Sequence, residues 1–118
     1  MRYNRAMNDT VLADPILARL KKELEAIYGA RLKRVLLYGS RARGDHQPDS
    51  DYDVLVVLEG PIERPAEQKK LVGLSTRILW ETIAEGNPAV VSFMSMTEEL
   101  MHQRTGFMHN VRLESREI

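Results

Sequence analysis

The sequence VLLYGSRARG at residues 35–44, together with SDYDVLVVL at residues 50–58, decides the fold of this chain. Both stretches contain short apolar runs that are rich in β-branched or bulky residues and too short for a typical helix. They predict two strands, over residues 34–38 and 51–58. The second run is apolar on both of its faces, which indicates an interior strand covered on both sides.

The turn after the first strand has the features of an anion site. Gly39 lets the backbone turn sharply and come close to a ligand. Ser40 is then expected to cap a one-turn helix over residues 41–43, which ends at Gly44. The N-terminus of a helix presents N–H groups to an anion, and a hydroxyl and two guanidinium groups are adjacent in the sequence. The turn therefore predicts a site for a phosphate group.

Two aspartates begin the second strand. Asp51 and Asp53 are two residues apart, so their side chains are expected on one face with their Cα atoms about 6–7 Å apart. Two like charges beside an apolar strand repel each other and are costly to desolvate unless a cation binds between them. Carboxylate oxygens suit Mg²⁺, which proteins usually hold through one or two carboxylates and the phosphates of a substrate. The pair therefore predicts a magnesium site.

These residues resemble the nucleotidyltransferases of the DNA polymerase beta superfamily. The pattern is Gly39-Ser40, ten intervening residues, and then Asp51-Tyr52-Asp53. The Gly-Ser-Arg-Ala-Arg-Gly and Ser-Asp-Tyr-Asp runs are similar to those of the small prokaryotic minimal nucleotidyltransferases. That group includes the antitoxin partners of HEPN-domain proteins. The resemblance covers about residues 17–100, and its two-part motif is highly specific.

The resemblance implies transfer of a nucleoside monophosphate from a Mg²⁺-bound nucleoside triphosphate to an acceptor hydroxyl, with AMP from ATP as the expected case. In that picture Gly39 and Ser40 hold the triphosphate. Asp51 and Asp53 are then the catalytic residues and the metal ligands. The acceptor is expected on a partner protein, and the resemblance suggests a tyrosine of a HEPN-type protein in a toxin–antitoxin system.

Two arginines follow the phosphate-binding turn. Arg41 and Arg43 are both candidates for nucleotide or phosphate binding. One of them is expected to contact the triphosphate, while the other pairs with Asp45, Asp49 or solvent. The sequence does not choose between the two arginines.

Composition excludes several classes of protein. The 118 residues carry 17 basic and 17 acidic side chains, so no overall field favours nucleic acid or membrane binding. The chain has no cysteine, which excludes disulfides, a thiol nucleophile and a thiolate metal site. No apolar run approaches the roughly 20 residues of a membrane span, and no signal peptide is recognisable. A cytoplasmic location is expected.

The rest of the chain predicts a small α/β (α+β) domain. Residues 1–13 are expected to be a flexible N-terminal lead-in, and residues 14–118 a single nucleotidyltransferase-like domain. Helices are predicted from Pro15 to Gly29 and over residues 64–85. With a third strand over residues 89–94 they give a small mixed β-sheet of three main strands, with room for a short fourth, flanked by helices as in the polymerase beta core.

The C-terminal part gives weaker signals. Residues 95–98 fit a capping box, so a last helix is expected to begin near Thr97 and to be interrupted by Gly106. Residues 107–113 are then expected to form a short strand or an irregular tail. Trp80 is interpreted as a packing residue rather than a base-stacking platform, because no basic patch accompanies it.

The third strand departs from the pattern that the resemblance implies. Superfamily members often carry a third carboxylate there, interpreted as the group that helps deprotonate the attacking hydroxyl. Residues 89–94 contain no acid; Ser92 is a weak ligand, and Glu85 and Glu98 are expected to be displaced from the site. Two carboxylates are enough to bind one Mg²⁺ with the triphosphate, but this strand supplies no acid for a second metal or for a general base.

Three functions follow from these observations. The first is a metal-dependent nucleotidyltransferase acting on a partner protein. The second is a catalytically weak or inactive binding module of the same fold that neutralises or scaffolds a HEPN-type partner. The third is a small-molecule nucleotidyltransferase of the antibiotic-modifying type, which the short chain disfavours. The intact two-part motif favours the first, and the missing carboxylate favours the second.

Overall fold

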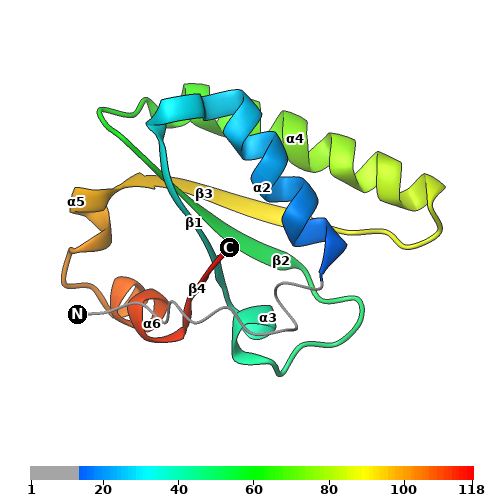
Figure 1. Ribbon diagram of the computed structural model, residues 1–118. Helices are drawn as coiled ribbons and strands as arrows, with labels where there is room; N and C mark the ends of the chain where they lie inside the picture. The colour runs from blue at the N-terminus through cyan, green and yellow to red at the C-terminus, as the bar shows by residue number, and fades with distance from the viewer. Residues whose placement is uncertain (1–13) are drawn as a thin grey trace.

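The computed structural model describes residues 14–118 and contains one mixed four-stranded sheet (Figure 1). Its strands are β1 (Leu32–Tyr38), β2 (Tyr52–Leu58), β3 (Val91–Thr97) and β4 (Arg116–Glu117), in the order β3-β2-β1-β4. β1 is antiparallel to both β2 and β4, and β3 is parallel to β2. The mixed sheet with a short fourth strand is as predicted, and the expected N-terminal lead-in over residues 1–13 lies outside the described residues.

Two long helices cover one face of the sheet (Figure 1): α2 (Pro15–Tyr28) and α4 (Arg64–Ala84). α2 begins as its sequence predicts, because the Asp14 side chain accepts a hydrogen bond of 2.9 Å from the Ile16 N–H. Arg19 on α2 donates to Glu85, just beyond the end of α4, at 3.2 Å. The parallel β2–β3 pair requires a crossover connection, and α4 provides it.

The opposite face of the sheet carries the shorter helices α5 (Glu98–Met101) and α6 (Gly106–Glu114). The one-turn helix α3 (Ser40–Arg43) follows β1, and a 3₁₀ turn, η1 (Gly29–Arg31), precedes it. The apolar side chains buried on this face come from β1, β2 and β3 and from both helices: Leu36, Leu55, Val57, Met96, Met101, Met108 and Val111. All five residues from Val54 to Leu58 are fully buried, which confirms β2 as an interior strand.

The prediction of a strand or tail over residues 107–113 is wrong, because these residues lie in α6. The Thr105 hydroxyl caps this helix by accepting from the Met108 N–H at 3.1 Å. Arg112 is buried and donates to the carbonyls of Met101 at 2.5 Å and Gln103 at 3.1 Å. The helix is thus stabilised by its Thr105 cap and by the buried Arg112, which bonds to the segment before the helix. A short apolar pattern in the sequence does not reveal the Arg112 contacts.

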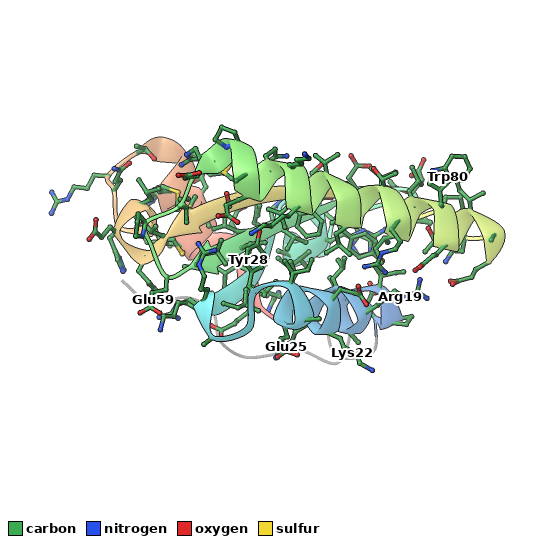
Figure 2. The ribbon with its side chains drawn as sticks, turned by 90° about the horizontal axis from the view of Figure 1, so that it is seen from above. Arg19, Lys22, Glu25, Tyr28, Glu59 and Trp80 are labelled. Carbon is green, nitrogen blue, oxygen red and sulfur yellow. The ribbon has the colours of Figure 1, made fainter. Side chains whose placement is uncertain are left out.

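Two smaller expectations also need correction. β3 begins at Val91 and continues to Thr97, and Thr97 rather than Ser95 caps the next helix by accepting from the Leu100 N–H at 3.3 Å. Trp80 does not pack in the core: it is 67% exposed on the outer side of α4 (Figure 2). The helix buries Leu71, Leu74 and Ile78 instead. No helix within residues 14–118 is long and apolar enough to span a membrane.

Candidate active site

The centre of the candidate site is the contact between Gly39 and Asp53. These residues lie at the end of β1 and near the start of β2, where Tyr38 pairs with Asp53 across the antiparallel ladder. A Cβ atom placed on Gly39 would lie 2.4 Å from Asp53 Oδ2, and the glycine has a φ of +76°. Only glycine fits both the close approach and the positive φ without strain. The predicted phosphate turn and the predicted metal-binding carboxylate are therefore in direct contact.

The short helix α3 starts one residue earlier than the sequence indicates. Gly39 rather than Ser40 occupies the N-cap position, and no side chain caps the helix. The first backbone bonds run from the Ala42 and Arg43 N–H groups to the Gly39 carbonyl. The N–H groups of Ser40 and Arg41 precede these bonds and point out of the helix N-terminus, as in any helix. Gly44 ends α3 in the left-handed conformation, as predicted.

One row of side chains crosses three strands at this end of the sheet. Asp53 pairs with Tyr38 on β1 and with Ser92 on β3. Since side chains alternate along a strand, all three lie on the face that carries α5 and α6. Asp51 is exposed and directly precedes β2. The structure thus places Ser92 beside Asp53, on the strand where the resemblance implies a third carboxylate.

The electrostatics of the row favour a cation. Burial raises the pKa of Asp53 above its ordinary value, the charge of Asp51 raises it further, and Arg43 lowers it. Burial also raises the pKa of Tyr38, and the negative charge of Asp53 adds to that effect. Each shift means that negative charge is poorly compensated at this site. Carboxylate oxygens in such surroundings fit a hard divalent cation.

Arg41 holds the loop that leads to the aspartates. Its guanidinium donates to the carbonyls of Ser50 at 3.0 Å and Pro48 at 3.2 Å, and its Cζ lies 3.9 Å from the centre of the Tyr52 ring. The Tyr52 hydroxyl donates to Asp14 Oδ2 at 2.9 Å. Through this chain of contacts the start of α2 supports the loop before Asp51.

Arg43 is the more accessible of the two arginines. Its guanidinium pairs with Asp45 at 3.2 Å and with Glu114 of α6 at 3.2 Å, and the side chains of Arg43, Asp45 and Glu114 are 43%, 61% and 37% exposed. Pairing of one arginine with Asp45 is among the alternatives that the sequence left open. Exposed ion pairs of this kind contribute little and exchange readily. The Arg43 side chain is therefore available to an incoming anion.

The acids nearest to β3 in the sequence do not reach the site. Glu85 pairs with Arg19 on the opposite face of the sheet, and Glu98 pairs with Arg34 at 2.7 Å. Among residues 14–118, no cluster of three or more aspartates, glutamates or histidines is arranged to hold a metal ion. A metal bound at Asp51 and Asp53 would thus take its remaining ligands from the substrate and water.

Sequence reasoning missed two contributors to the site. Tyr38 was recognisable, because the last residue of one strand faces the first residues of the next in an antiparallel pair. The second is the C-terminal segment: Glu114 reaches Arg43, and Arg116 Nε donates to the Ala42 carbonyl at 2.8 Å. No local pattern in the sequence signals these long-range contacts.

Comparison with known proteins places this geometry in a family. The family model described as "Nucleotidyltransferase domain" matches residues 17–106, which include the whole turn and both aspartates. The chain belongs to the nucleotidyltransferase domain family. Its fold and its two-part motif therefore agree with the polymerase beta-like superfamily that the sequence resembles.

Two relatives of this nucleotidyltransferase domain come from Methanocaldococcus jannaschii. "Putative protein adenylyltransferase MJ0141" is 38% identical over 64 residues, 52% of this chain and 62% of that relative. "Putative protein adenylyltransferase MJ0604" is 30% identical over 95 residues, 79% of this chain and 84% of that relative. The chain thus spans less than two thirds of the first relative's length. No solved structure matches the chain.

We predict that Gly39→Ala displaces the Asp53 carboxylate, whereas Gly44→Ala does not. Both glycines have positive φ values, +76° and +87°, so both variants lose stability to backbone strain. The cost is about 1–2 kcal/mol at Gly44, which is left-handed, and about 1–3 kcal/mol at Gly39, whose ψ of −157° lies in a region almost restricted to glycine. Only at Gly39 does the new Cβ meet the carboxylate, since nothing lies within 4 Å at Gly44. NMR titration of the Asp53 carboxyl group measures this: its resonance and pKa change in Gly39→Ala alone. Equal changes in both variants would contradict the contact.

We also predict that Asp53→Asn stabilises the metal-free protein at neutral pH. The folded-state pKa of Asp53 is raised, so the ionised carboxylate costs folding free energy above that pKa, and this cost disappears as the pH falls below the ordinary value of 3.8. The gain in unfolding free energy should therefore shrink towards acid pH. Denaturant unfolding in EDTA measures it, with exposed Asp49→Asn as the control. A gain independent of pH would contradict this electrostatic cause.

Proposed function

We propose that the protein is a divalent-metal-dependent nucleotidyltransferase that transfers AMP from ATP to a hydroxyl group on a partner protein. The observation that carries the proposal is the contact of Gly39 with Asp53, which sets the phosphate turn against a metal-binding carboxylate. A triphosphate held at Gly39 and Ser40 would extend over the two aspartates. Family membership and the relatives' names, which describe protein adenylyltransferases, support the proposal.

The donor set fits Mg²⁺. Asp51 and Asp53 supply hard oxygen ligands, and the raised pKa of Asp53 reflects burial and the repulsion from Asp51, which a bound cation would relieve. When bound, the metal would neutralise charge on the triphosphate and on the departing pyrophosphate. The protein's own contribution is to hold these carboxylates beside the turn that receives the phosphates.

The transfer step needs little covalent chemistry from the protein. The acceptor oxygen forms a bond to the α-phosphorus, and the bond from that phosphorus to the oxygen bridging to the β-phosphate breaks. Pyrophosphate leaves with the electron pair of the broken bond. The acceptor's proton passes to solvent, since Ser92, and not a carboxylate, is the β3 neighbour of Asp53. Ser40, the adjoining N–H groups and Arg43 orient the phosphates, while Arg41 keeps the loop before Asp51 in place.

The acceptor in this proposal is a protein hydroxyl, a tyrosine of a HEPN-type partner in a toxin–antitoxin pair. The names of the two relatives support a protein acceptor, and the resemblance to minimal nucleotidyltransferases supports the class of partner. A second function, a binding module of the same fold that neutralises such a partner without turnover, is favoured by one observation. This observation is that Ser92, rather than a third acid that would assist catalysis, lies beside Asp53 on β3.

We predict that label from ATP radiolabelled on the α-phosphate passes to a protein in an extract of the native cell, whereas label on the γ-phosphate does not. The transfer should require Mg²⁺ and fall more than about a hundredfold in Asp53→Asn, because losing even the outer partners of metal ligands costs 10–100-fold. Asp49→Asn is the matched control. If the partner co-purifies equally with wild type and Asp53→Asn while neither labels it, the binding-module function replaces the enzyme.

A further inference from the structure

A cavity of about 180 Å³ lies between the candidate active site and the C-terminal helix α6. Tyr38 and Gly39 line it on the sheet side, and Phe107 and Asn110 line it on the helix side. Because Gly39 also contacts the Asp53 carboxylate, the cavity opens next to the position expected for the triphosphate. The phosphate turn and the cavity thus share one wall.

The helix wall is tied to the site by polar contacts. Glu114 pairs with Arg43 at 3.2 Å, and Arg116, directly after α6, donates to the Ala42 carbonyl at 2.8 Å. The family match ends at residue 106, so these residues and the helix side of the cavity lie outside it. Family similarity therefore assigns no role to this wall.

We infer that this cavity binds the nucleobase of the nucleoside triphosphate and selects adenine. The inference rests on the proposed function, because it requires the triphosphate to lie at Gly39 and Asp53. The volume is below the roughly 300–1,000 Å³ of pockets that hold a drug-sized ligand, so it admits one flat ring system and not a whole nucleotide. The ribose and phosphates then extend out of the cavity over the aspartates.

The aromatic side chains suit a base. Phe107 is 45% exposed, although burial of a phenylalanine side chain is favourable. Its ring packs edge to face on the Tyr38 ring, with 5.8 Å between the ring centroids and an interplanar angle of 88°. The Tyr38 contact holds the Phe107 ring beside the opening, where a base can stack on it. Stacking of a base on an aromatic ring stabilises a complex without selecting a particular base.

Asn110 supplies the selection. Its amide offers one acceptor and one donor side by side, the pattern that matches the N6 and N7 edge of adenine. The corresponding edge of guanine carries two acceptors and favours arginine or lysine. Among residues 14–118, Arg43 is the one cation that lines the cavity, and in the proposed function it serves the triphosphate rather than the base. The side-chain chemistry of the cavity therefore favours adenine over guanine.

Calorimetric titration in Mg²⁺ with ATP, GTP and inorganic tripolyphosphate tests the inference. Wild type should bind ATP about tenfold more tightly than GTP. Asn110→Ala should lose about tenfold in ATP affinity and most of the preference for ATP over GTP, and Phe107→Ala about tenfold for both nucleotides. Tripolyphosphate, which has no base, should bind all these variants equally. His109→Ala, an exposed change on the same helix, is the matched control and should bind ATP like wild type.

The outcomes distinguish failure of the nucleobase pocket from failure of the proposed function. Unchanged ATP and GTP affinities in both Asn110→Ala and Phe107→Ala, with tripolyphosphate still bound, overturn the nucleobase pocket and leave the proposed function standing. Absence of tripolyphosphate and ATP binding in folded wild-type protein overturns both. Thermal unfolding of each variant checks that the exposed substitutions leave the fold intact.

Discussion

The candidate site depends on one steric constraint, the absence of a side chain at Gly39. The β1 strand must end with a turn whose backbone passes directly against the Asp53 carboxylate, at a distance that no Cβ atom permits. The antiparallel register of Tyr38 with Asp53 holds the two strands in this relation. Since β2 is buried on both faces along Val54–Leu58, the register cannot slip without moving apolar side chains out of the core. Core packing thus fixes the geometry of a site at the ends of the central strands β1 and β2.

Supports from both faces of the sheet meet at this point. On the α2 face, the Asp14 side chain caps the helix and accepts a hydrogen bond from the Tyr52 hydroxyl. The Arg41 guanidinium stacks on the Tyr52 ring and donates to the carbonyls of the loop before Asp51. On the α6 face, the C-terminal segment reaches Arg43 and the Ala42 carbonyl. The carboxylates themselves are left with unfavourable charge, as the raised pKa of Asp53 indicates. This combination of a rigid frame and uncompensated charge is typical of a ligand site.

The parts of the structure that could be predicted are those set by local chemistry. The buried strand, the Asp14-Pro15 helix start and the Gly44 stop each follow from residues within a few positions. The parts that escaped prediction depend on distant partners. α6 needs the cap at Thr105 and the buried Arg112, and Trp80 is exposed because Leu71, Leu74 and Ile78 fill the contact of α4 with the sheet. The role of Arg41 in holding the loop depends on Tyr52, whose side chain points to the opposite face from Asp53.

The central claim is that the Gly39 turn and the two aspartates form one site for a metal-bound triphosphate. Calorimetric titration of the protein with ATP, first in Mg²⁺ and then in EDTA, tests it most directly when repeated on Asp51→Asn/Asp53→Asn. Magnesium-dependent binding in wild type that weakens by about tenfold or more in the double variant is the predicted result. Binding that is equally tight in EDTA, or equally tight in the double variant, would contradict the claim.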